Sequence, residues 1–379
     1  MADHPAQRPI AVFTGSRAEY GLLRHLIASI GSDPDLNLRL IVSGSHLSAS
    51  HGSTLAEIEA DGNQPAALVP LALDQTPPPS MAALSAEALA GVAQALECLQ
   101  PELLILLGDR YEAFAAAAAA HLVGIPVLHL HGGETTEGAI DDRLRHAITQ
   151  LSTWHFTAAE PYRQRLIAMG QPPERVFTVG PMVLDGLLAA PPACRSAFEL
   201  STGYRFGSRN LLITYHPETL LADRGVAGFE ALLQALEVTP CHVLFTHPNA
   251  DAGRDQLLAL LMAFAQRHHQ RCWTVPSLGQ QSYLAALQLF EAVAGNSSSG
   301  VIEAPLLGLP VLNIGGRQSG RLRHGVGVHD ALADPSEIAT GLEKVLSAGQ
   351  RSVWPRPSPQ SGRAPAAAIL TWLRAGGWR

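Results

Sequence analysis

The sequence predicts an α/β protein made of two parallel sheets, each covered by helices on both faces. Apolar runs of strand length alternate with longer helical stretches, first over residues 10–179 and again over 211–346. Strands joined through helices pair in parallel, and two such series give two doubly wound sheets. A proline-containing interval at 180–192 separates the series and predicts the domain boundary.

The first series predicts six strands with helices between them. Its strands are expected at 10–14, 37–43, 103–107, 125–130, 154–158 and 175–179. Its helices are expected at 20–30, 85–99, 113–123, 142–151 and 162–169, because apolar residues recur there at helical spacing.

The second series repeats this alternation after a loop-like stretch that lasts to Gly207. Strands are expected at 211–215, 241–246, 272–275, 289–294 and 310–314, and helices at 228–236, 256–268, 280–287, 300–307 and 335–346. The domains are therefore placed at 1–185 and 186–360, and a final helix within 361–379 would pack back on the first domain. Two Rossmann-like domains with a cleft between them follow the glycosyltransferase-B-like plan.

Composition limits the kind of partner. The chain has 379 residues, of which 47% are hydrophobic and 16% charged, so it can bury large cores. A net charge of -7 and no long basic run argue against nucleic acid. No signal-peptide pattern or membrane-spanning run is evident. The scattered cysteines show no disulfide or zinc pattern and indicate the reducing cytoplasm: Cys98, Cys194, Cys241 and Cys272.

Acidic residues gather after two neighbouring strands of the first series. Residues 128–146 read LHLHGGETTEGAIDDRLRH, which places Glu134, Asp141 and Asp142 between a strand and a helix. Asp109 follows the preceding strand, and parallel pairing would bring it beside Glu134. One isolated acidic residue there would be read as solvated, but several converging carboxylates suggest acid/base chemistry on a neutral group.

A serine-rich turn in the second series suits a diphosphate. Small and hydroxyl residues follow a strand and open a helix: Gly295, Asn296, Ser297, Ser298 and Ser299. A plain helix cap would need fewer serines. Glu303 lies one turn later and could accept from ribose hydroxyls, while Arg317 and Arg321 could reach the same phosphates. No GxxxxGK[ST] motif is present, which argues against a P-loop NTPase.

Further candidates follow other strands. Gly15, Ser16 and Arg17 form a weak phosphate cradle after the first strand. Ser45 and His46 lie in the loop after the second strand. His216 and His247 close strands of the second series, where a structural histidine is about as expected as a functional one. No set of histidine and acidic residues has metal-like spacing.

Taken together, these segments resemble the UDP-N-acetylglucosamine 2-epimerase family, and most closely its hydrolysing branch of the sialic acid and legionaminic acid type. The resemblance covers both domains, and the HGGE-to-IDD block at 131–148 is specific to the hydrolysing branch. The serine turn is shared with non-hydrolysing relatives. The other matching segments are 14–22, 43–48, 108–110, 249–253, 295–303 and 313–321.

The resemblance implies a reaction and a set of roles. UDP would leave C1 of UDP-N-acetylglucosamine while C2 loses a proton, and water would add to the resulting 2-acetamidoglucal with inversion at C2. It implies no cofactor or metal, and a homodimer or homotetramer. The catalytic residues implied are Asp109, Glu134, Asp141 or Asp142, and His216. Those implied to bind the UDP-sugar are Arg17, Ser45, His46, Asn249, Asp251, Gly295, Asn296, Ser297, Ser298, Ser299, Glu303, Arg317 and Arg321.

Several alternatives remain open at this point. Departures from the family at 51–54 and 246–248 leave the nucleotide sugar undecided, with UDP-2,4-diacetamido-2,4,6-trideoxyglucose or a GDP-sugar as alternatives. A UDP-sugar transferase of the same architecture would need an acceptor and fewer carboxylates. A non-hydrolysing epimerase would lack the HGGE-to-IDD block. A non-catalytic sensor would have no need of every candidate carboxylate.

Overall fold

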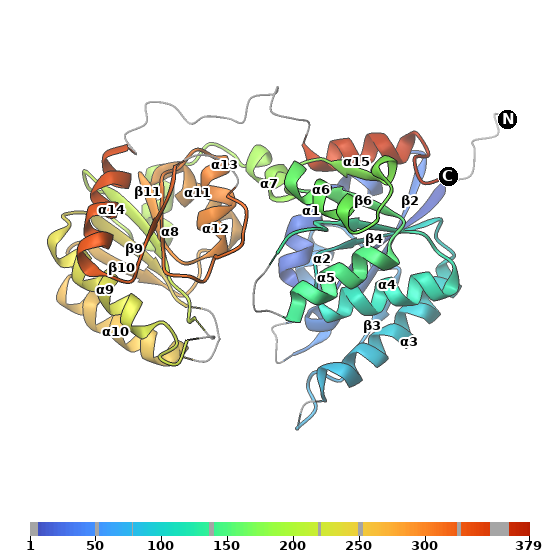
Figure 1. The fold of residues 1–379 in the computed structure, drawn as a ribbon, viewed down its shortest axis with the longest axis horizontal. Coiled ribbons are helices and arrows are strands. Elements are labelled where there is room, and N and C mark those ends of the chain that lie inside the picture. Colours follow the sequence, from blue (N-terminus) through green and yellow to red (C-terminus); the bar gives the residue numbers. More distant parts are fainter. Residues whose placement is uncertain are drawn as a thin grey trace. The chain divides into compact units, whose positions relative to one another are not determined.

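The structure, a computed structural model, describes residues 7–49, 53–77, 79–135, 140–218, 221–248, 253–323, 327–348 and 364–379. The chain divides into two compact units, each built around its own sheet (Figure 1). The first unit comprises Met1–Gly186 with Pro359–Arg379, and the second comprises Leu187–Ser358. The predicted α/β class with two parallel sheets is confirmed.

The first unit holds a seven-stranded parallel sheet. Its strands are β1 (Arg8–Thr14), β2 (Leu36–Ser43), β3 (Ala67–Val69), β4 (Leu103–Leu107), β5 (Val127–Leu130), β6 (Trp154–Thr157) and β7 (Val176–Thr178). Their order is β3-β2-β1-β4-β5-β6-β7. The chain therefore winds outward from β1 to one edge and from β4 to the other, which makes the β1/β4 boundary the switch point where such sheets bind ligands.

Helices cover both faces of this sheet and create two apolar layers. One layer contains apolar residues of α1 and α15, and the other those of α3 and α4. Alternate β1 residues serve the two layers, since Ile10 and Val12 join the first and Ala11 and Phe13 the second. The helical segments are α1 (Arg17–Gly31), η1 (Gly44–Leu47), α2 (Leu55–Ala60), α3 (Met81–Leu99), α4 (Tyr111–Val123), α5 (Ile140–Leu151), α6 (Glu160–Ala168), η2 (Pro173–Arg175) and α15 (Pro365–Arg374). A further helix, α7 (Val183–Ala189), begins in the first unit and ends in the second.

The C-terminal helix α15 belongs to the first unit and packs against α1 (Figure 1). Both carboxylate oxygens of Asp185 accept from the Ala366 amide at its start, at 3.2 and 3.0 Å. The fully buried Ile369 and Leu373 enter the first apolar layer, and the Trp372 ring packs edge-on against Trp154. These contacts join two segments far apart in the sequence into one core.

We expect Ile369→Ala to lower the free energy of unfolding by about 2–5 kcal/mol, because it removes a fully buried side chain and leaves a cavity. The exposed Leu122 of the same unit provides the control, and Leu122→Ala should change stability by less than about 0.5 kcal/mol. Urea denaturation followed by tryptophan fluorescence measures both. Equal effects would show that α15 does not contribute to the core.

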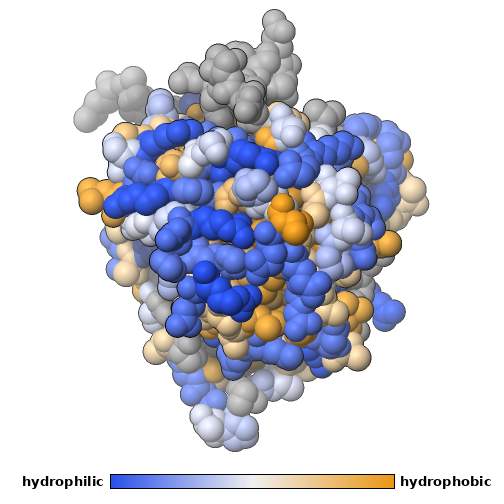
Figure 2. All heavy atoms as spheres, turned by 90° about the vertical axis from the view of Figure 1, so that its left-hand side faces the viewer, coloured by the Kyte–Doolittle hydropathy of each residue, from blue (hydrophilic) through white to orange (hydrophobic). Residues whose placement is uncertain are grey.

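The second unit holds a six-stranded parallel sheet around one apolar core. Its strands are β8 (Asn210–Thr214), β9 (His242–Thr246), β10 (Cys272–Val275), β11 (Ala292–Gly295), β12 (Val311–Ile314) and β13 (Val328–Ala331), in the order β10-β9-β8-β11-β12-β13. Its helices are α8 (Arg195–Thr202), α9 (Val226–Val238), α10 (Arg254–Arg267), α11 (Gly279–Leu289), α12 (Ser298–Val301), α13 (Glu303–Leu306) and α14 (Pro335–Ala348). Among the described residues seen in Figure 2, the surface is mostly hydrophilic with dispersed apolar residues.

Some elements differ from the sequence prediction. The short edge strands β3 and β13 were not expected, nor were α7 and α8 in the interval predicted as loop. The helix predicted at 300–307 is broken at Ile302 into α12 and α13, and the strand predicted from residue 289 begins later because α11 continues to Leu289. Among the described helices, α3 is long and apolar enough to cross a membrane, but this is weak evidence because core helices pass the same test, and α3 packs against α4.

Candidate active site

Asp109 and Glu134 follow neighbouring strands of the first unit, at the same edge of the sheet. β4 and β5 pair in parallel with Leu107 opposite Leu130, so the chain leaves both strands side by side. Gly108 turns the chain after β4 with a φ of +85°, a conformation that favours glycine. The expected proximity of the two strand ends is therefore present in the fold.

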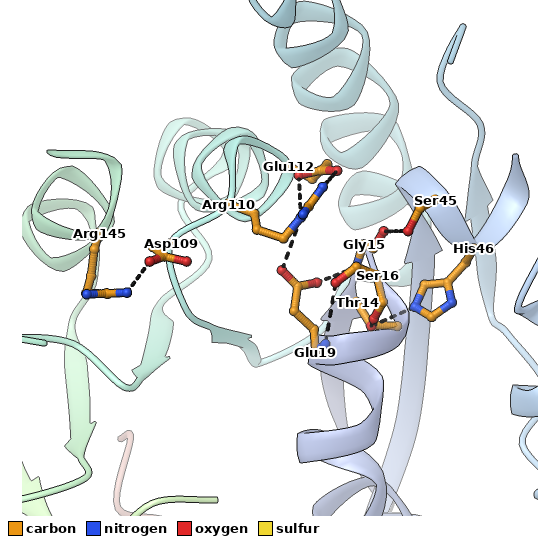
Figure 3. Close-up of polar contacts among 10 residues, drawn as sticks. All are labelled: Thr14, Gly15, Ser16, Glu19, Ser45, His46, Asp109, Arg110, Glu112 and Arg145. Atoms are coloured by element: carbon orange, nitrogen blue, oxygen red, sulfur yellow. Dashed lines mark hydrogen bonds and ion pairs between the residues drawn. The ribbon is translucent and has the colours of Figure 1, made fainter. Parts of the chain in front are cut away.

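The Asp109 carboxylate is held by a buried cation. Arg145 of α5 forms an ion pair with Asp109 Oδ2 (Figure 3), and the arginine side chain is 6% exposed while that of Asp109 is 21% exposed. Arg145 Nε and Nη1 are buried with no hydrogen-bond partner. An arginine buried to this degree needs a negative partner, and the ion pair fixes the direction of the Asp109 carboxylate.

His129 of β5 connects the two segments that carry Asp109 and Arg145. The fully buried imidazole donates from Nε2 to the Gly108 carbonyl at 2.8 Å, and Nδ1 lies 3.3 Å from the Thr149 hydroxyl on α5. Burial lowers the pKa of His129 to about 3, so the ring is neutral at pH 7. The turn that carries Asp109 and the helix that carries Arg145 are thus tied to one strand.

Glu134 is oriented by His131. The Met182 amide donates to His131 Nε2 at 3.0 Å, which leaves the ring proton on Nδ1, and Nδ1 lies 2.7 Å from Glu134 Oε1. His131 adopts a φ of +64°, which is uncommon for a residue with a side chain and typical of functional sites. The strained backbone and two ring contacts aim the Glu134 carboxylate.

Asp141 and Asp142 lie in the first turn of α5, where the helix dipole stabilises negative charge. The Asp142 carboxylate is 3.8 Å from His146 Nε2, one turn later on the same helix. The other ring nitrogen of His146, Nδ1, is buried without a hydrogen-bond partner. The structure thus adds a histidine beside one member of the predicted pair.

The loops after β1 and β2 meet at the switch point (Figure 3). Ser45 donates to the Gly15 carbonyl through its amide at 2.9 Å and its hydroxyl at 3.2 Å. The His46 ring is buried, with Nε2 3.0 Å from the Thr14 hydroxyl and Nδ1 2.7 Å from that of Thr54, and burial lowers its pKa to about 4. Arg17 is exposed and forms a surface ion pair with Glu57 at 3.1 Å.

In the second unit, Asn296 pins the main chain of His216. The Asn296 side chain accepts from the His216 amide at 2.7 Å and donates to the His216 carbonyl at 2.9 Å. Burial, followed by the charge of Arg317, lowers the pKa of His216 to about 4, so its ring is neutral at pH 7. Asn296 thus joins the ends of β8 and β11 and sets where His216 emerges.

The serine turn presents hydroxyls beside a buried carboxyl. Ser297 is at the N-cap position of α12 and makes no capping hydrogen bond with its side chain, and the Ser299 hydroxyl contacts that of Tyr283 on α11. Glu303 Oε2 is buried with no hydrogen-bond partner, and burial raises the pKa of this group, while a hydrogen bond from Ser299 and the charge of Arg321 act against the rise. An acceptor oxygen left in this state can take a hydroxyl donor.

Two further residues hold this turn from the loop after β12. Arg317 Nη1 and Gln318 Nε2 both donate to the Asn296 carbonyl, at 3.3 and 2.7 Å. The Gln318 side chain is 2% exposed, so this contact is part of the core of the second unit. Arg317 and Arg321 therefore lie on a loop that is fixed to the serine turn.

Two of the residues predicted to bind the UDP-sugar, Asn249 and Asp251, lie outside the described residues. His247 follows β9, and its Nε2 is buried without a partner. Within the described ranges, no group of three or more histidine, cysteine or acidic side chains is arranged to hold a metal ion.

Sequence reasoning missed the residues that orient the carboxylates. Arg145 and His129 lie 36 and 20 residues from their partners Asp109 and Thr149, so no local spacing reveals them. His131 stands three residues before Glu134, and this spacing within a strand-to-helix turn was a usable signal.

Comparison with known proteins gives a consistent picture. A family model described as UDP-N-acetylglucosamine 2-epimerase matches residues 28–363. The UDP-N,N'-diacetylbacillosamine 2-epimerase (hydrolyzing) of Legionella pneumophila is 35% identical, over 90% of this chain and 89% of that one. The GDP/UDP-N,N'-diacetylbacillosamine 2-epimerase (hydrolyzing) of Campylobacter jejuni is also 35% identical, over 84% and 83%. A UDP-N-acetylglucosamine 2-epimerase of Neisseria meningitidis is 32% identical, over 82% and 81%.

Solved structures share the fold. A crystal structure of a Listeria monocytogenes protein, described as a UDP-N-acetylglucosamine 2-epimerase, has a TM-score of 0.80 at 18% identity and covers 98% of this chain and 97% of its own. A Neisseria meningitidis UDP-GlcNAc 2-epimerase bound to UDP-GlcNAc has a TM-score of 0.72 at 17% identity, covering 98% and 100%. At these identities the likeness concerns architecture.

Proposed function

Because the chain belongs to the UDP-N-acetylglucosamine 2-epimerase family, we propose that it is a hydrolysing 2-epimerase that converts a UDP-linked 2-acetamido sugar into UDP and the free 2-epimer. The observation that carries this proposal is the pair of oriented carboxylates after β4 and β5, Asp109 with Arg145 and Glu134 with His131. Both relatives named as hydrolysing enzymes are 35% identical to this chain.

The chemistry needs cleavage at C1 before proton loss at C2. The C2 proton of the substrate is not acidic, but departure of UDP from C1 gives oxocarbenium character that acidifies it. Loss of that proton yields UDP and a 2-acetamidoglucal. Water then adds across the double bond, with the hydroxyl going to C1 and a proton to the opposite face of C2. The enzyme therefore has to stabilise the leaving diphosphate and place acid/base groups at C2.

Inversion at C2 calls for two proton-handling groups on opposite faces of the sugar. Asp109 is paired with Arg145, and Glu134 accepts from the Nδ1–H of His131, so both side chains are preorganised. We propose that one of them removes the C2 proton and the other delivers a proton in the hydration step. Asp141 and Asp142 would position the attacking water from the start of α5.

The second unit supplies the groups that suit UDP. We propose that Ser297, Ser298 and Ser299 donate to the diphosphate and that Arg317 and Arg321 balance its charge. The unpartnered Oε2 of Glu303 supports a role in accepting a ribose hydroxyl. His216, neutral at pH 7 because burial lowers its pKa to about 4, would donate a hydrogen bond to the leaving group without adding charge.

Two substrates are proposed. UDP-N-acetylglucosamine would give N-acetylmannosamine, in line with the relative from Neisseria meningitidis. UDP-2,4-diacetamido-2,4,6-trideoxyglucose is the second candidate, favoured by the names of the two relatives at 35% identity, one of which also includes a GDP-sugar. Either product would feed sialic or legionaminic acid formation in a bacterial cytoplasm, and we infer a homo-oligomeric enzyme.

Incorporation of deuterium from the solvent tests whether the reaction removes the proton at C2. In D₂O, we expect the free sugar to carry deuterium at C2, because the proton that leaves C2 differs from the one delivered to the opposite face. Proton NMR of the released sugar measures this, and recovered substrate should keep its C2 proton if proton loss commits the molecule to UDP release. A product that keeps its original C2 proton would rule out the elimination.

A further inference from the structure

Two buried carboxyl groups share one guanidinium at the switch point of the first sheet. Glu19 lies in the first turn of α1, directly after β1, and Arg110 and Glu112 follow β4 (Figure 3). β1 and β4 are neighbours where the winding of the sheet reverses. The cluster is therefore next to Asp109, in the place where such sheets bind ligands.

The two carboxyl groups hold Arg110 unequally. Glu112 is fully buried and accepts from Arg110 Nη2 at 2.8 Å and from Nε at 3.2 Å. Glu19 is 6% exposed, and its Oε2 accepts from the Gly15 amide at 2.7 Å. Its Oε1 is buried with no hydrogen-bond partner, 4.0 Å from Arg110 Nε. Glu112 already neutralises Arg110, so an ionised Glu19 would be a second buried negative charge.

Tight packing keeps Glu19 from escaping to solvent. A Cβ on Gly15 would lie 3.2 Å from Glu112 Cβ and 3.4 Å from Glu19 Oε2. A Cβ on Gly44 would lie 2.5 Å from the Gly15 carbonyl and 3.1 Å from Glu112 Oε1. The turns after β1 and β2 thus close directly over both carboxyl groups. The second negative charge can therefore be removed only if Glu19 takes up a proton.

We propose that Glu19 is a positioning residue that takes up a proton when the nucleotide sugar binds, so that the exposed side of the Arg110 guanidinium serves the anionic diphosphate and not a second carboxylate. This inference rests on the proposed function for the identity of the anion. The Arg110 side chain is 43% exposed, which leaves it accessible to a ligand.

The charges around Glu19 set the direction of the pH dependence. Burial raises the pKa of Glu19 to about 7, the charge of Arg110 lowers it, and the charges of Glu112 and Asp109 raise it. Burial also raises the pKa of Tyr111 on α4, and it lowers that of His46 on η1 to about 4, so both are neutral at pH 7. A bound diphosphate adds negative charge and raises the pKa of Glu19 further. Affinity should be highest below pH 7 and fall above it, by up to about tenfold per pH unit.

The test compares the pH dependence of KM in the wild type, Glu19→Gln and the exposed control Glu97→Gln between pH 6 and 9. We expect the wild-type and control KM to rise above pH 7, and the KM of Glu19→Gln to stay low and flat, because glutamine keeps an acceptor for the Gly15 amide and cannot ionise. A nucleotide sugar has no phosphate group that titrates in this range. Identical profiles for the wild type and Glu19→Gln would overturn the proposal.

A second measurement does not depend on turnover. Calorimetric titration with UDP in two buffers of different ionisation enthalpy gives the protons taken up on binding. At pH 7.5 we expect the wild type to take up more protons than Glu19→Gln, because only the wild type can protonate Glu19. Protons exchanged by UDP itself are the same for both proteins and cancel in this difference. Equal uptake would overturn the inference. If UDP binding shows this difference in proton uptake but no UDP-sugar is turned over, only the proposed function is contradicted. If Glu19→Gln fails to fold, a wild-type KM that does not change with pH would overturn the inference.

Discussion

Asp109→Asn is expected to lower kcat by about 10²–10⁴-fold, the range for the loss of a group that transfers a proton, which is the role proposed for Asp109 at C2. Asparagine has nearly the same shape and still accepts from Arg145, but it can neither take up nor carry the proton. The ion pair with the 6% exposed Arg145 becomes a neutral contact, so some loss of stability accompanies the loss of turnover. Steady-state release of UDP, measured beside thermal unfolding, separates the two effects.

Asp255→Asn is the matched control, because the Asp255 side chain on α10 is 98% exposed. It should leave both kcat and thermal unfolding unchanged. We also expect Asp109→Asn to bind UDP nearly like the wild type, since Asp109 is not among the residues proposed to hold UDP. Full turnover by a folded Asp109→Asn protein would remove Asp109 from the acid/base assignment.

Gly295→Ala is expected to lower the free energy of unfolding by about 2–6 kcal/mol, from backbone strain and overpacking together. Gly295 ends β11 with a φ of +124°, a region that side chains rarely adopt. A Cβ there would lie 2.0 Å from the Thr214 carbonyl oxygen, which is backbone and cannot move aside. The shift would separate β8 from β11 and loosen the Asn296 contact with His216.

Gly203→Ala isolates the steric part of this effect. Gly203 also has a positive φ, +73°, but a Cβ there would meet nothing within 4 Å. It should cost only about 1 kcal/mol. Urea denaturation and UDP binding of both variants give the comparison, with lost UDP affinity expected for Gly295→Ala alone. If both variants lost the same free energy of unfolding and bound UDP equally well, the serine turn would tolerate displacement and the steric argument would be wrong.

The alternation of apolar runs was enough to predict the two parallel sheets, because buried parallel strands carry a continuous apolar signal. The strand β3 was not predicted, because it has only three residues, of which one is buried. The helix α8 was not predicted, because it follows several prolines and buries only Phe198. Helix breaks such as the one at Ile302 depend on local backbone angles that composition does not report.

The candidate site was predictable to the extent that chemistry lies at strand ends. The loops that carry Asp109, Glu134 and the serine turn could be placed from the strands before them. The partners that orient these groups could not, because Arg145 contacts Asp109 from α5, 36 residues later in the chain, and the Met182 amide contacts His131 across 51 residues. The burial of Glu19 depends on how the turns after β1 and β2 pack, which appears only in three dimensions.

The central claim is hydrolysis with inversion at C2, and product analysis tests it most directly. Purified protein would be incubated with UDP-N-acetylglucosamine, and in parallel with UDP-2,4-diacetamido-2,4,6-trideoxyglucose, without metal or acceptor, and followed by phosphorus and proton NMR. We predict free UDP together with the free 2-epimer of one of these sugars. A UDP-sugar epimerised at C2 with UDP still attached, or release of UDP only when an acceptor is added, would contradict the account.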